Sequence, residues 1–178
     1  FNATNTTSGD ITLNDTGALS ITGVTQSGGG NLSITTTGAI TQTGAISVAG
    51  SGTSSFTAGA NTITLNNTSN NFTGAVTFSN SGAANEVSVF NNTALILAAS
   101  TIGHNLTATA TGAITQTGAL ISSNAGLLTV KTQNNSGSAI TLNNTSNNFA
   151  DVNLQARNAA DSANVAGAIA YTDTNAIN

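Results

Sequence analysis

Few residues in this chain could do acid, base or metal chemistry. Two carboxyl groups that lie close together can act as general acid and general base, which is how many polysaccharide-cleaving enzymes work. The acidic residues here are Asp10, Asp15, Glu86, Asp151, Asp161 and Asp173. They stand near the two ends of the chain with Glu86 alone between them, and we expect none to share a coil with a lysine or arginine. The spacing predicts no catalytic residues, and we expect no enzyme.

Metal and cofactor sites are not expected either. The chain has no cysteine and a single histidine, His104, so it lacks the usual ligands of a zinc site. A calcium site of the β-roll type would need a glycine-rich nonapeptide repeat, which is missing. The prediction is therefore no bound metal and no cofactor.

The low charge and the hydropathy pattern limit the classes of partner that the chain can be expected to bind. Only 4 % of the 178 residues are charged and the net charge is -4, whereas about 25 % is typical of globular domains. The two basic residues, Lys131 and Arg157, are too few to replace the counterions of a nucleic acid. No run of about 18 apolar residues predicts a membrane span. The chain starts at Phe1 without a basic and apolar leader, so we expect a processed product or an excised piece.

The residue alphabet favours short strands and turns. The chain is 38 % hydrophobic, so its low charge does not indicate disorder. Its polarity comes from threonine, serine and asparagine. Threonine, valine and isoleucine prefer strands, and asparagine and glycine tolerate the backbone of tight turns. These preferences predict an all-β fold.

Two long strings occur twice. TGAITQTGA covers residues 37–45 and 111–119, a shift of 74 residues, and ITLNNTSNNF covers residues 63–72 and 140–149, a shift of 77. A weaker match places the starts of successive units near Ile11, Val87 and Ile169. We expect a single domain over residues 1–178, with repeats at about 11–86 and 87–168 and a third that begins at 169. Repetition of this kind is typical of stacked architectures.

Apolar-polar-apolar triplets recur along both repeats and predict strands with one buried face. They cover residues 11–13, 19–21, 32–34, 46–48, 63–65, 76–78, 87–89, 140–142 and 152–154. An antiparallel barrel or sandwich would be expected to carry Asn-Gly or Asp-Gly hairpins, and neither dipeptide occurs. The pattern favours a parallel β-helix, a solenoid. With roughly 19 to 21 residues per coil, it would have about eight or nine coils, and one repeat would span about four.

Paired asparagines mark the expected corners of the coils, where their amides can bond to neighbouring coils or to the backbone. They are Asn66, Asn67, Asn70, Asn71, Asn143, Asn144, Asn147 and Asn148. The phenylalanines Phe56, Phe72, Phe78, Phe90 and Phe149 are expected to fill the interior or the corners. Asp15, Asn91 and Asp173 align with one another, so that position is expected to need a short turn-forming side chain rather than a charge.

The strings GAITQTGAISVAG, FTAGANTITLNNTSNNFTGAVTFSN and NLTATATGAITQTGAL resemble the repeats of large bacterial exoproteins of the filamentous haemagglutinin type, the adhesins of two-partner secretion. The resemblance runs from about Ile11 to Asn178. It implies a right-handed, three-faced parallel β-helix, export across the outer membrane, and a role in adhesion, aggregation or matrix. The chain has no proline and hence none of the family's Asn-Pro-Asn signals. It is therefore similar to the shaft and not to the secretion domain.

These features together predict a structural and adhesive segment of a secreted or cell-surface bacterial fibre that contacts glycans or matrix. Two alternatives remain open. A β-helix that binds or degrades polysaccharide would need clustered carboxylates in a cleft. An ice-binding solenoid would need a flat face of threonines in register, for which Thr41-Gln42-Thr43 and Thr115-Gln116-Thr117 supply suitable spacing.

The phase of the repeat also predicts a partner. The last ten residues restart the pattern of residues 11–20, so the carboxyl end is expected to expose a strand edge that another copy could continue. We expect either head-to-tail joining of copies or continuation into further repeats. The candidate interface consists of Ile11, Leu13 and Leu19 at one end and Ile169, Tyr171 and Ile177 at the other.

Overall fold

The computed structural model describes residues 1–177, which form 21 strands and no helix. The strands are β1 Asn2–Asn5, β2 Ile11–Asp15, β3 Leu19–Ile21, β4 Gly23–Gln26, β5 Leu32–Thr36, β6 Ile40–Gln42, β7 Ile46–Val48, β8 Ser54–Thr57, β9 Ile63–Leu65, β10 Asn71–Phe72, β11 Ala75–Ser79, β12 Val87–Asn91, β13 Leu95–Leu97, β14 Ser100–Ile102, β15 Leu106–Ala110, β16 Ile114–Gln116, β17 Leu120–Ser122, β18 Leu127–Gln133, β19 Ile140–Leu142, β20 Asp151–Arg157 and β21 Ile169–Tyr171. All nine predicted triplets lie within these strands. No helix long and apolar enough to cross a membrane occurs in the described part of the chain.

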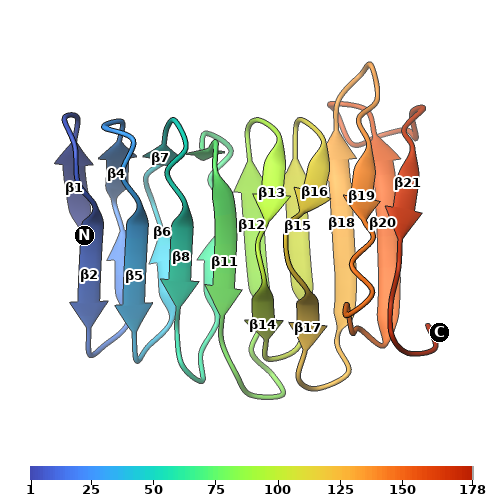
Figure 1. Cartoon of the computed structure of the whole chain (residues 1–178), viewed down its shortest axis with the longest axis horizontal. Coiled ribbons are helices and arrows are strands. Elements are labelled where there is room, and N and C mark those ends of the chain that lie inside the picture. The colour runs from blue at the N-terminus through green and yellow to red at the C-terminus, as the bar shows by residue number, and fades with distance from the viewer. Residues whose placement is uncertain (178) are drawn as a thin grey trace.

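The strands wind into a parallel β-solenoid, as predicted. Each strand pairs with the equivalent strand one coil away, so the coils stack into a rod with the amino-terminal coil at one end and β20 and β21 at the other (Figure 1). One sheet has four strands in the order β1-β4-β7-β10, and another has seven, from β3 to β20. The third has ten strands, because β11 pairs with both β13 and β14.

The rod has about seven turns, slightly fewer than the eight or nine predicted. The cause is coil length. One coil takes 19 residues between the paired Val87 and Leu106 but 29 between the paired Ile140 and Ile169. Since the corners tolerate extra residues without disturbing the stacked strands, the 19 to 21 residues expected per coil is too short.

The repeat does not contain a whole number of turns. The sequence ITQ forms β6 and again β16, and ITL forms β9 and again β19, so one repeat advances the chain by ten strands. With three strands per turn, ten strands make three turns and a third. Accordingly β6 lies in the seven-stranded sheet while β16 lies in the ten-stranded one. The expected four coils per repeat is wrong, and successive repeats start on different faces of the rod.

The core is a continuous column of apolar side chains inside the coils. Strands such as β12 alternate buried and partly exposed residues, because successive side chains point to opposite faces of a sheet. Phe56 packs between Phe72 and Phe78, with ring centroids 5.9 and 6.0 Å apart, and Phe149 is also fully buried. Phe90 differs from the prediction, since it occupies an outward position of β12 and is only half-buried.

Candidate functional site

The first repeated corner is held by two amide side chains that bond to each other. The Gln42 side chain donates to Oδ1 of Asn70 over 2.9 Å, and Asn70 donates back to Oε1 of Gln42 over 2.8 Å. Asn70 is fully buried. Its Oδ1 also accepts the Ile46 N–H, and its Nδ2 also donates to the Leu65 carbonyl. We call this arrangement the amide clasp. It ties one coil to the next at a corner.

The second repeat contains an equivalent amide clasp. Gln116 and Asn147 exchange hydrogen bonds of 2.9 and 3.0 Å, and Asn147 is again fully buried. Asn147 accepts the Leu120 N–H and donates to the Leu142 carbonyl, as Asn70 does for Ile46 and Leu65. The glutamine belongs to one recurring string and the asparagine to the other. The two strings recur together because they form the two halves of one hydrogen-bonded unit.

The other corner asparagines have different roles. Asn67 and Asn144 each accept the N–H of the serine two residues later, over 2.9 Å, which closes a tight turn. Asn71 accepts from the Thr93 hydroxyl, and the backbone of Asn148 pairs with that of Ile121. Asn66 and Asn143 are exposed, and their side chains form no hydrogen bond within residues 1–177. The partly buried glutamines of the two amide clasps, Gln42 and Gln116, were not among the predicted site residues.

The aligned position of Asp15, Asn91 and Asp173 lies where one repeat follows another. Asn91 Oδ1 accepts the N–H of Phe72 over 2.8 Å, and Asp173 Oδ2 accepts the N–H of Phe149 over 3.2 Å. The position therefore needs an acceptor that reaches back to the preceding coil, which both side chains provide. Asp15 lies in the first coil, and its carboxylate accepts no hydrogen bond from the described residues.

The two ends of the rod are open strand edges. Among the described strands, β1, β2 and β3 each pair on one side only, and so does β21. The predicted interface residues lie at these ends. At the amino end, Ile11 and Leu13 are partly buried in β2, and Leu19 of β3 is almost covered. At the carboxyl end, Ile169 and Ile177 are each 46 % exposed.

Tyr171 is the third predicted interface residue at the carboxyl end. It is partly buried against the core, and its hydroxyl donates to the Asp173 carboxylate. Burial and the neighbouring carboxylate both raise the pKa of the Tyr171 hydroxyl well above its ordinary value. Tyr171 therefore stays neutral at physiological pH.

Most carboxylates are kept apart, but one forms an ion cluster that sequence reasoning missed. Asp161 contacts Lys131 Nζ over 2.6 Å and Arg157 Nε over 2.9 Å, so both basic residues of the chain meet on one carboxylate. The expectation that no acidic residue shares a coil with a cation is wrong for Asp161. Hydrogen bonds from Lys131 and then Arg157 lower the pKa of Asp161 below its ordinary value. No group of three metal-binding side chains occurs in residues 1–177.

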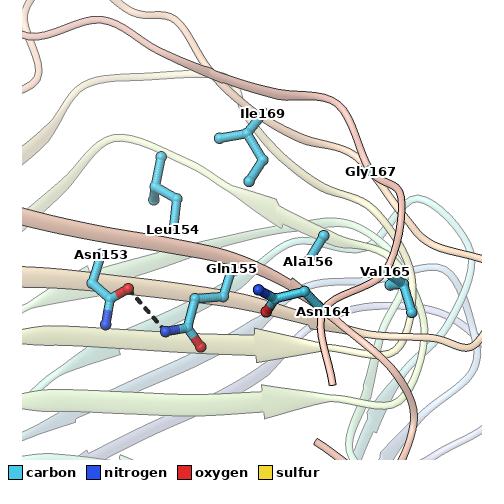
Figure 2. A pocket seen from close by; sticks show the side chains of 8 residues that line it. All are labelled: Asn153, Leu154, Gln155, Ala156, Asn164, Val165, Gly167 and Ile169. Atoms are coloured by element: carbon cyan, nitrogen blue, oxygen red, sulfur yellow. Dashed lines mark hydrogen bonds between the residues drawn. The ribbon is translucent and has the colours of Figure 1, made fainter. Parts of the chain in front are cut away.

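A groove of about 410 Å³ runs beside the ion cluster, along the outer edge of β20 (Figure 2). It is lined by Asn153, Leu154, Gln155, Ala156, Asn164, Val165, Gly167 and Ile169. None of these residues is charged. The Gln155 side chain donates to Oδ1 of Asn153 over 3.1 Å, so the polar groups of the floor are partly satisfied. The groove lies where the next coil of a longer stack would continue the seven-stranded sheet.

Comparison with known proteins identifies the repeat. Residues 8–79 and 84–156 each match the family described as repeats of unknown function (DUF5649). The chain belongs to this family. The first DUF5649 segment covers the ten strands β2 to β11. The second covers the nine strands β12 to β20, because an isolated bridge at Asn148 takes the place of β10. The family unit therefore corresponds to the sequence repeat. No curated protein and no solved structure matches the chain. None of these findings links it to filamentous haemagglutinin or two-partner secretion.

Proposed function

We propose that the chain is a structural and adhesive segment of a secreted or cell-surface bacterial fibre. The observation that carries the proposal is the parallel solenoid with unpaired strand edges at both ends. Parallel strands at an edge present unpaired N–H and C=O groups that another strand can pair with. A rod of this kind extends by adding coils, either from a second copy or from further DUF5649 repeats of the same chain.

The outward side chains support a role in contact. On β2, β5, β8 and β11, outward hydroxyl and amide side chains stack in two neighbouring files. One file is Thr12, Ser33, Ser55 and Thr77, and the other is Asn14, Thr35, Thr57 and Ser79. None of these side chains bonds to another group within residues 1–177, so their hydrogen-bonding capacity is free for a ligand. An uncharged hydroxyl surface suits neutral, hydroxyl-rich partners such as glycans.

If this proposal holds, separate copies of the chain should join end to end. At high protein concentration, the purified chain should form thin filaments of constant width, because addition of a coil pairs strand edges that water otherwise solvates. Sedimentation velocity over a concentration series, with negative-stain microscopy of the same samples, measures this. A single species of monomer mass at every concentration would contradict end-to-end joining of this chain.

A further inference from the structure

The carboxyl-terminal coil carries a hairpin that runs against the direction of the rest of the fold. Residues 157–165 turn back along the outer edge of β20, where Arg157 and Asn164 form an antiparallel bridge. The Val165 N–H donates to the Ala156 carbonyl over 3.0 Å, and the Asn158 N–H donates to the Ala163 carbonyl over 2.9 Å. All pairs between named strands are parallel. We call residues 157–165 the edge strap.

The ion cluster holds the edge strap in place. Asp161 lies within the strap, whereas Lys131 reaches it from β18, the strand beneath β20. Arg157 adds two bonds, from Nη2 to the Asp161 carbonyl over 2.7 Å and from Nη1 to Oδ1 of Asn164 over 2.7 Å. Asp161 also has a φ of +54°, a conformation that costs energy for a residue with a side chain. The contacts of its carboxylate compensate for that cost.

The edge strap occupies part of the position that another coil needs. β20 pairs with β18 over seven residues, and a further parallel strand would continue this sheet. The edge of β20 beside Asn153 and Gln155 faces the open groove, whereas the end near Ala156 is already paired with the strap. Asn164 and Val165 form one wall of the groove in Figure 2. A strand that paired with the whole of β20 would have to displace them.

We propose that the edge strap regulates end-to-end joining: while Asp161 holds it, the strap keeps β20 from pairing with an amino-terminal strand of a second copy. This inference rests on the proposed function. A second copy is the fitting occupant because its first coil offers unpaired parallel strands that continue the β18–β20 pairing. Natural proteins often protect exposed edges by covering them. Here the cover is fastened by ion pairs and can open.

The test uses the full chain with Asp161→Asn. Asparagine tolerates the left-handed backbone at this position, but it removes the charge that holds Lys131 and Arg157. Hydrogen exchange should show about tenfold weaker protection of the amides of Asn158 and Val165. The protein concentration at which half of the chains are joined end to end should fall about tenfold. Lys131→Gln, which removes one ion pair from outside the strap, should change both quantities in the same direction.

Asp151→Asn is the matched control. Asp151 lies at the other end of β20, is exposed, and its side chain bonds to nothing in the described residues. The Asp151→Asn substitution removes the same charge from the same end of the rod without touching the strap, so it should leave strap protection and joining unchanged. A fall in the joining concentration as large as that of Asp161→Asn would show that net charge, not the strap, controls joining.

Other results of these experiments would distinguish a wrong role of the edge strap from a wrong fibre function. If Asp161→Asn loosens the strap while wild type and variant join equally well, the regulatory role is wrong and the fibre function stands. If the strap is loosened and neither protein joins, end-to-end joining itself is wrong. Unchanged protection of Asn158 and Val165 would show that Asp161 does not hold the strap.

Discussion

Replacing Asn70 with alanine should lower the free energy of unfolding by about 3 kcal/mol or more, since each buried hydrogen-bonding group left without a partner costs about 1–3 kcal/mol. The substitution removes the acceptor of the Ile46 N–H, the Asn70 donor to the Leu65 carbonyl, and both hydrogen bonds of the amide clasp. A methyl group cannot reach these atoms. Chemical denaturation followed by circular dichroism measures the loss.

Asn66→Ala is the control for this substitution. Asn66 lies in the same corner, but it is exposed and its side chain makes no hydrogen bond within the described residues. Its replacement should change stability by no more than about 0.5 kcal/mol. Asn147 and Asn143 offer the same comparison in the second repeat. Equal effects at the buried and the exposed asparagine would show that the amide clasp does not join the coils.

Replacing Phe56 with alanine should cost about 3–5 kcal/mol, the usual range for a fully buried phenylalanine. Its ring contacts Phe72 edge-on and stacks on Phe78, so the substitution leaves a cavity between coils. The coils cannot close this cavity, because the stacked strands fix their spacing. The midpoint and slope of urea unfolding give the change in free energy.

Phe90→Ala tests whether the loss comes from the core. Phe90 points outward from β12 and is only half-buried. The same substitution there should cost less than about 1.5 kcal/mol, because a partly exposed ring loses less apolar contact. If Phe90→Ala destabilises the chain as much as Phe56→Ala, the inward and outward faces of the coils have been assigned wrongly.

The parallel solenoid could be predicted because its two causes are both visible in the sequence. Triplets such as Ile63-Thr64-Leu65 alternate with a period of two, and repeated strings require equivalent positions along a stack. The number of coils was harder to predict from the sequence. Coil length varies at the corners, and the ten-strand repeat is not a multiple of the three strands in a turn. A repeat length therefore does not yield a coil length by simple division.

The contacts of the site were harder to predict than its residues. Asn70 and Asn147 were expected at corners, but their partners Gln42 and Gln116 lie 28 and 31 residues away, more than one coil. A usable signal was that the TQTG and LNNTSNNF strings always occur together. The Asp161 cluster was missed because Lys131 is 30 residues away and the antiparallel strap departs from the stacking rule.

The distance between spin labels at Ser20 and Asn153 tests the stacking of the coils most directly. The chain has no cysteine, so cysteines at these positions label specifically. Ser20 and Asn153 occupy the same file on the first and last strands of the seven-stranded sheet. Six steps between strands predict a separation of about 29 Å, and Ser20 to Ser88 should give half of that. A Ser20–Asn153 distance equal to the Ser20–Ser88 distance, or a broad distribution without a maximum, would contradict the stacked rod.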